Sequence, residues 1–193
     1  MNKEQFNEYW IKHYPESFPI DYKLRDYYPD RWLRIHSLPE SKQYADTKEE
    51  YDIILGRQNY VISGLIEENS EIIIVTGLFE LEDSEVTPIE FSEYGNFTKC
   101  ASLELHKIFP EENEFDFFYD VYISNFIWEK NSINKLLKDI ADNKLRAMIV
   151  SPSGKCIVHP YDGGMDIIVE TQEKRDELKI EYEDWLSERE DGM

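Results

Sequence analysis

The segment from His159 to Asp166 holds the densest group of side chains that could do chemistry. It reads His-Pro-Tyr-Asp-Gly-Gly-Met-Asp, which places an imidazole beside the phenol of Tyr161 and the carboxylates of Asp162 and Asp166. Histidine can exchange a proton near neutral pH, and paired carboxylates can hold a metal ion. Asp-Gly is also the strongest short-range signal for a β-hairpin. The simpler interpretation of the segment is therefore a tight turn.

A second polar group lies in the segment from Arg31 to Lys42, which begins Arg-Trp-Leu-Arg-Ile-His. Alternate residues of a β-strand share a face, so Arg34 and His36 are expected to project together. Such arginines bind anions or a partner's carboxylates. In so acidic a chain, the alternative is that they pair with carboxylates of the chain itself. The candidate binding residues are Arg31, Arg34, His36, His159, Tyr161, Asp162 and Asp166.

No stretch has the spacing of an established catalytic or metal-binding motif. Residues 151–155 contain a Gly-Lys pair, but they lack the upstream glycine and the following Ser or Thr of a phosphate-binding loop. The chain has no Gly-x-Ser-x-Gly nucleophile elbow. A metal site near Asp162 would need further ligands at matching spacing, and none is visible. We expect no catalytic residue, no metal and no cofactor, so an enzyme is the less favoured interpretation.

Charge limits the classes of partner. The 193 residues include 41 acidic and 21 basic side chains, for a formal net charge of −20. This charge argues against nucleic acid and against an anionic membrane surface, because both are bound through Lys and Arg. Residues 58–129 carry 16 acidic side chains against Lys99 and Lys107, a balance of −14. That balance would attract a basic protein, although a solvated surface that keeps the protein soluble is the plainer interpretation.

The cysteines and the N-terminus both indicate the cytoplasm. Cys100 and Cys156 form no Cys-x-x-Cys pair, and both stand among apolar residues, as buried free thiols of reducing compartments do. The N-terminus has no apolar signal-peptide core. The longest aliphatic run, residues 72–75, is far shorter than the ~20 residues of a membrane span.

Hydrophobic periodicity predicts the elements that would position the two polar segments. Helices are expected over residues 2–14, from Thr47 to about residue 67, after Asn131 or Ser132, and after Thr171. Strands are expected over residues 31–38, 71–80, 97–105, 116–128, 146–150, 155–159 and 165–169. Because the strands cluster as hairpins, we expect one α+β domain over residues 1–193, with helices packed on a largely antiparallel sheet.

The C-terminal part has the most specific predicted topology. Its last three strands should form a consecutive antiparallel meander followed by a final helix, because the connections at residues 151–154 and 161–164 are only a few residues long. The turn chemistry also predicts a positive φ at Gly163 or Gly164.

Three parts of the chain together resemble an uncharacterised family of small bacterial cytoplasmic proteins. They are the run from Arg31 to Lys42, the turn from His159 to Asp166 and the ending Trp185-Leu186-Ser187. From about Tyr119 to Trp185, the chain is more distantly similar to a second bacterial domain of unknown function, which carries a Tyr-Asp-Asp-Arg-Gly turn. Here the turn is Tyr161-Asp162-Gly163-Gly164, so no role of that arginine carries over. The resemblance implies a bacterial source, a shared fold and no active site.

The favoured hypothesis is a non-enzymatic acidic protein-binding domain. Its specific form is an immunity-type inhibitor of a basic toxin, by analogy with other small acidic bacterial domains. Encounter with such a partner would be steered by charge, so neutralising Glu80, Glu82, Asp83 and Glu85 together should slow association.

The alternative is an enzyme or a small-ligand-binding domain with a pocket near Arg34, His159, Tyr161 and Asp162. The two hypotheses differ in one structural feature. A pocket requires the segments around Arg34 and His159 to converge on one concavity, whereas capture of a protein does not.

Overall fold

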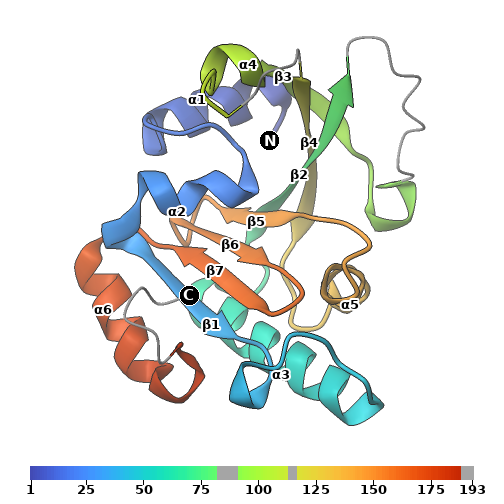
Figure 1. Cartoon of the computed structure of the whole chain (residues 1–193), viewed down its shortest axis with the longest axis vertical. Helices are drawn as coiled ribbons and strands as arrows, with labels where there is room; N and C mark the ends of the chain where they lie inside the picture. Colours follow the sequence, from blue (N-terminus) through green and yellow to red (C-terminus); the bar gives the residue numbers. More distant parts are fainter. Residues whose placement is uncertain (82–90, 113–116, 188–193) are drawn as a thin grey trace.

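The chain folds around one antiparallel β-sheet with helices on both faces (Figure 1). The computed structural model describes residues 1–81, 91–112 and 117–187. Over these residues the sheet has seven strands in the order β1-β7-β6-β5-β2-β4-β3, and each neighbouring pair is antiparallel. The predicted α+β class with a largely antiparallel sheet is confirmed.

The element bounds lie close to the predicted ones. The strands are β1 (Trp32–His36), β2 (Glu71–Leu81), β3 (Thr98–Glu104), β4 (Phe117–Ile127), β5 (Met148–Ser151), β6 (Cys156–Pro160) and β7 (Gly164–Ile168). The helices are α1 (Lys3–His13), α2 (Leu24–Tyr27), α3 (Lys48–Leu65), α4 (Leu105–Ile108), α5 (Asn134–Ala141) and α6 (Gln172–Glu181). Short 3-10 turns include η1 (Asp21–Lys23), η2 (Pro29–Arg31), η3 (Pro39–Ser41), η4 (Phe91–Tyr94) and η5 (Glu183–Trp185). Asp116, at the start of one predicted strand, lies outside the described residues.

Local capping chemistry explains where the long helices begin. The hydroxyl of Thr47 accepts a hydrogen bond from the backbone of the third residue of α3, and Thr171 does the same for α6. The predicted cap of α5 is wrong. That helix begins at Asn134, because Asn131 adopts a φ of 70° and Ser132 belongs to the turn before the helix.

The sheet separates two apolar cores, because successive side chains of a strand point to opposite faces. On β2, Ile72 and Ile74 pack in the core that also contains α3, α5 and α6. Ile73 and Val75 pack in the core that contains α1 and the segment following it. Both faces of β2 are therefore buried in apolar cores over residues 72–75, which explains the unbroken aliphatic run.

The segment between α1 and β1 covers the second face and carries a buried acid to the sheet. Ile20 and Leu24 are fully buried on either side of Asp21, which is itself only 6% exposed. The indole N–H of Trp10 donates to the carbonyl of Ser17 at 3.0 Å and fixes the course of the segment as it leaves α1. The two apolar anchors thus bring the carboxylate of Asp21 onto the sheet.

β5, β6 and β7 form the predicted antiparallel meander, and α6 follows it. The reason predicted for its glycines is wrong, because neither Gly163 nor Gly164 has a positive φ. A Cβ at Gly164 would instead lie 2.2 Å from the backbone oxygen of Ile35 on β1. Glycine is required at this position by the close approach of a neighbouring strand, and not by the conformation of the turn.

Candidate functional site

Three polar side chains form a row across the outer strands of the sheet. Asp166 on β7 stands opposite Arg34 on β1 and opposite His159 on β6. Strand alternation places all three on the same face as Trp32 and Ile168, which is the face covered by the N-terminal segment. Two segments that are far apart in the sequence therefore meet in one row.

Arg34 and Asp166 form a bidentate ion pair. Nε and Nη2 of Arg34 donate to the two carboxylate oxygens of Asp166 at 2.7 and 2.8 Å. The two side chains are 18% and 16% exposed, so the pair is largely shielded from water. The guanidinium also lies over the ring of Tyr161, 4.9 Å from its centroid. Arg34 thus pairs with a carboxylate of its own chain, the alternative noted from the sequence.

A second polar contact joins the sheet to the N-terminal segment. Nε2 of His159 lies 3.2 Å from Oδ2 of Asp21, at ion-pair distance but without hydrogen-bond alignment. Burial by itself would raise the pKa of Asp21. Interactions with His159, with Arg146 and with the backbone of Tyr22 outweigh burial and hold that pKa below its usual value. The carboxylate therefore stays ionised beside the imidazole.

The row opens into a pocket of about 290 Å³, which we call the arginine pocket. Its walls come from β1, β6 and β7, from the segment around η1 and α2, and from the loop between α5 and β5. It is lined by Tyr22, Arg25, Arg34, Ile140, Asn143, Leu145, Arg146, His159, Pro160, Tyr161, Asp162 and Asp166. Every candidate residue except Arg31 and His36 is therefore part of one concavity.

The turn between β6 and β7 forms one rim of the pocket. Asp162 accepts a hydrogen bond from the side-chain amide of Gln43 at 2.7 Å and another from the backbone of Gly163 at 2.8 Å. Burial raises the pKa of the Tyr161 hydroxyl above its ordinary value, so this phenol stays protonated. The turn therefore places two groups at the rim of the pocket. They are the neutral phenol of Tyr161 and the carboxylate of Asp162, which already accepts two hydrogen bonds from the protein.

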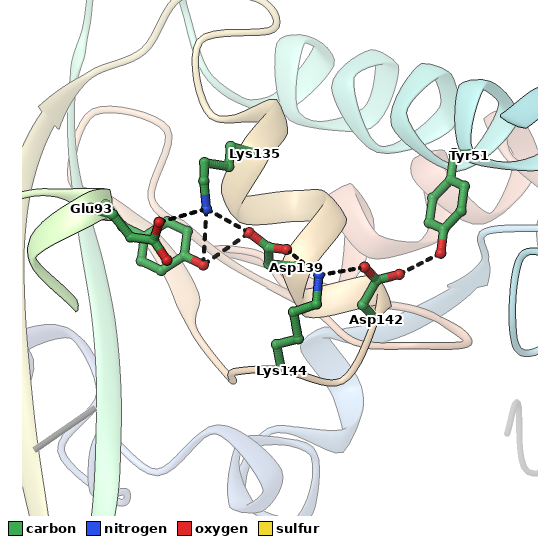
Figure 2. A network of polar contacts seen from close by, with 7 residues as sticks. Tyr51, Glu93, Lys135, Asp139, Asp142 and Lys144 are labelled. Atoms are coloured by element: carbon green, nitrogen blue, oxygen red, sulfur yellow. Dashed lines mark hydrogen bonds and ion pairs between the residues drawn. The ribbon is translucent and has the colours of Figure 1, made fainter. Parts of the chain in front are cut away.

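Arg146 reaches the pocket from the loop between α5 and β5, and a polar network holds that loop (Figure 2). Lys144 lies 2.7 Å from Asp139 and 2.8 Å from Asp142. Asp142 also accepts a hydrogen bond from Tyr51 of α3 at 2.5 Å. Figure 2 shows the network continuing through Lys135 to Glu93 in η4. The loop is thus bonded to α5 through Asp139 and to α3 through Tyr51.

The backbone and side chain of Arg146 have different environments. Its carbonyl accepts a hydrogen bond from Thr76 of β2 at 2.6 Å, which fixes the chain where it enters β5. Its side chain is exposed, and within the part of the chain described here it makes neither an ion pair nor a hydrogen bond. Its charge nevertheless acts on two neighbours. It helps to hold the pKa of Asp21 down, and it opposes the rise that burial and the charge of Asp21 cause in the pKa of Tyr22.

The remaining two candidate residues lie elsewhere. Arg31 covers the ring of Tyr28 at 4.3 Å from its centroid and donates to the carbonyl of Glu170 at 3.5 Å. His36 lines a separate groove of about 730 Å³ together with Arg57 and Trp185. Burial, aided by the charges of Arg34 and Arg57, lowers the pKa of His36. Arg34 and His36 share a strand face but line different concavities.

The candidate residues chosen from the sequence do not include the charged side chains of Asp21, Arg25 and Arg146 or the phenol of Tyr22. Asp21 contacts His159 although 138 positions separate them in the chain (159 − 21). Asp21, Tyr22 and Arg25 stand in a stretch that reads as a loop, and the sequence predicts that Arg146 begins a strand. The one local signal in the sequence is that Asp21 stands between two apolar residues, Ile20 and Leu24. Apolar periodicity cannot show in so short a segment that such an acid is buried.

Across residues 1–81, 91–112 and 117–187, no group of three or more His, Cys, Asp or Glu side chains is placed to hold a metal ion. In the same part of the chain, no helix has the length and apolar character needed to span a membrane.

Comparison with known proteins identifies a family match. The family model described as "Domain of unknown function (DUF3885)" matches residues 20–190, which include every wall of the arginine pocket. Neither the search of curated proteins nor the search of solved structures found a match.

Proposed function

The chain belongs to the DUF3885 family, a domain of unknown function, and we propose that this domain binds a small ligand in the arginine pocket. One observation carries the proposal. The segments around Arg34 and His159, selected from the sequence for their chemistry, line one concavity together with the segment around Asp21. A concave site with a few convergent polar groups beside ionisable residues of shifted pKa is typical of ligand-binding sites.

The size and lining of the pocket favour a small molecule and simple binding. Its volume of about 290 Å³ lies just below the usual range for ligand pockets, about 300 to 1,000 Å³. Among the described residues that line it, there is no serine, threonine or cysteine to act as a nucleophile. His159 and Asp21 could move a proton, so an enzyme is the second form of this proposal.

A fragment screen followed by two-dimensional ¹H–¹⁵N NMR tests the proposal. A ligand of the pocket should shift the signals of residues 22–25, 143–146 and 159–162 in a saturable manner. Signals around Arg31 and Tyr28, which line a different concavity, serve as an internal control. Shifts confined to that second site, or no saturable shifts at all, would contradict ligand binding in the arginine pocket.

Capture of a basic protein in a bacterial cytoplasm is a second proposal, supported by the charge distribution. Glu67, Glu68, Glu71 and Glu129 are all exposed where β2 begins and β4 ends, and Ile127 beside them is 54% exposed. Of the acidic residues selected from the sequence, Glu82, Asp83 and Glu85 lie outside the described residues.

A pull-down from bacterial lysate at low and high salt tests this second proposal. A captured basic partner should associate more slowly as salt rises, because exposed charges are screened over about 8 Å at physiological ionic strength. Neutralising Glu80, Glu82, Asp83 and Glu85 together should lower the association rate more than it raises the dissociation rate. If the partner associates at a rate that does not depend on salt, the acidic surface does not steer it.

A further inference from the structure

The arginine pocket is lined by more positive than negative side chains, whereas the protein as a whole is strongly negative. The chain has a net charge of −20, yet three guanidinium groups, those of Arg25, Arg34 and Arg146, line one pocket of about 290 Å³. Guanidinium groups match the geometry of carboxylate and phosphate oxygens, so their convergence in a concavity is typical of anion recognition.

The carboxylates of the lining do not neutralise all of this positive charge. Asp166 is occupied by Arg34 through two hydrogen bonds. Asp162 is occupied by Gln43 and by the backbone of Gly163. These two acids are already provided with donors from the protein, so they do not compete for Arg146.

Arg146 is the cation best placed to meet a ligand. Its backbone is fixed by Thr76, and the network of Asp139, Asp142 and Lys144 holds the loop that carries it. Its side chain is exposed and, within the described residues, makes no ion pair. Because the backbone is already fixed, only the side chain of Arg146 has to become ordered when an anion binds, and no protein partner has to be displaced from it.

His159 supplies a second contact. The residue lines the pocket and is 8% exposed, and its Nδ1 has no hydrogen-bond partner in the described part of the chain. A buried polar atom without a hydrogen-bond partner is destabilising, so a ligand atom that bonds to Nδ1 would be stabilising. Asp21 lies 3.2 Å from Nε2, so Nδ1 is the ring nitrogen left for a ligand.

We propose that the arginine pocket binds a small metabolite through a phosphoryl or carboxylate group, held by Arg146 and by His159. The proposal rests on the ligand-binding function proposed above and names the chemical class of the ligand. The pair of Arg34 and Asp166 forms the wall behind the anion. A nucleic acid is a poor occupant, since the pocket is small and the protein around it is acidic.

The test uses two anions and one matched pair of variants of the full chain. Inorganic phosphate and succinate represent the two chemical groups, and a set of neutral polyol and amide fragments represents uncharged ligands. Arg146→Gln removes the proposed partner, while Lys12→Gln removes the same charge from an exposed position on α1. Binding is followed by the NMR signals of residues 22–25, 143–146 and 159–162 at low ionic strength.

Phosphate, succinate or both should bind the wild type, and the one that binds identifies the group. Arg146→Gln should weaken binding by about tenfold or more, because a charge-assisted hydrogen bond is lost. Lys12→Gln should weaken it by less than about twofold, since only a distant, screened charge changes. Equal unfolding temperatures of the two variants would show that Arg146→Gln loses anion binding without losing stability.

Other results would overturn the proposal in distinguishable ways. If neutral fragments occupy the pocket and neither anion does, the pocket binds ligands of another class, and only the anion proposal fails. The same conclusion follows if Arg146→Gln binds the anions as tightly as the wild type. If no anion and no fragment moves the signals of the pocket, both the anion proposal and the ligand-binding function fail.

Discussion

The carboxylate of Asp166 accepts both hydrogen bonds that the guanidinium of Arg34 directs from β1 to β7. Arg34→Met should lower the free energy of unfolding by about 2 kcal/mol or more, because it leaves a shielded carboxylate without its partner. Urea unfolding of Arg34→Met, Asp166→Asn and the double variant measures the effect. The double variant should lose less than the sum of the single losses. Additive losses would show that the two side chains act independently.

Gly164 and Gly163 should respond very differently to alanine. A Cβ at Gly164 would lie 2.2 Å from the oxygen of Ile35, whereas at Gly163 the nearest atom is in the flexible ring of Tyr161 at 3.2 Å. Gly164→Ala should lower the free energy of unfolding by about 2 kcal/mol or more, and Gly163→Ala by less than about 1 kcal/mol. Thermal and urea unfolding check both values. Similar losses at the two positions would count against close strand approach as the reason for Gly164.

The loop network should make stability depend on pH in the acid range. Lys144 and the hydroxyl of Tyr51 hold the pKa of Asp142 below its usual value. A depressed pKa in the folded state stabilises the protein above the pKa of the unfolded chain, and this stabilisation is lost as the pH falls through the folded pKa. Asp142→Asn should therefore be less stable than the wild type near pH 7, and the gap should narrow below about pH 4.

Unfolding temperatures of the wild type and Asp142→Asn across this pH range provide the measurement. Asp142 lies in the network of Figure 2, and Asp26 pairs with Arg25 at the surface, so Asp26→Asn serves as an exposed control with the same chemical change. A stability gap for Asp142→Asn that does not change with pH would mean that the carboxylate contributes through packing alone.

Neither cysteine should react in the folded protein. Both thiols are free and buried, and burial raises the pKa of Cys100 to about 11 and that of Cys156 to about 12. Since the thiolate is the reactive form, a thiol reagent at about pH 8 should label neither residue in buffer and both in urea. Mass spectrometry after a short exposure reads the result. Rapid labelling of the native protein would show that one of the two sites opens to solvent.

The meander could be predicted from the sequence because its determinants are local. Two connections of a few residues leave adjacent strands no arrangement other than antiparallel pairing. Apolar alternation then sets which side chains are buried. The role of Gly164 was misjudged because it depends on β1, a strand from the other end of the chain.

The pocket could be predicted only in part. Arg34, His159, Tyr161, Asp162 and Asp166 were selected for their chemistry, and all of them line it. That they meet depends on the register of β1 with β7, which no local pattern encodes. Asp21 and Arg146 were missed, because each reaches the site from a connecting segment whose position is set by the packing of distant apolar residues.

The pairing of β1 with β7 also sets the order in which the pocket can appear during synthesis. Arg34 leaves the ribosome 132 residues ahead of Asp166, its partner in the ion pair. Among the described strands, β1 pairs only with β7, so until β7 follows β1 is unpaired and the walls made by the turn at Tyr161 do not exist. Contacts between such distant residues form slowly, since a long loop must close before any of them stabilises the fold. A nascent chain that stalls before β7 therefore lacks the arginine pocket, so the ligand binding proposed above requires that Asp166 has been synthesised.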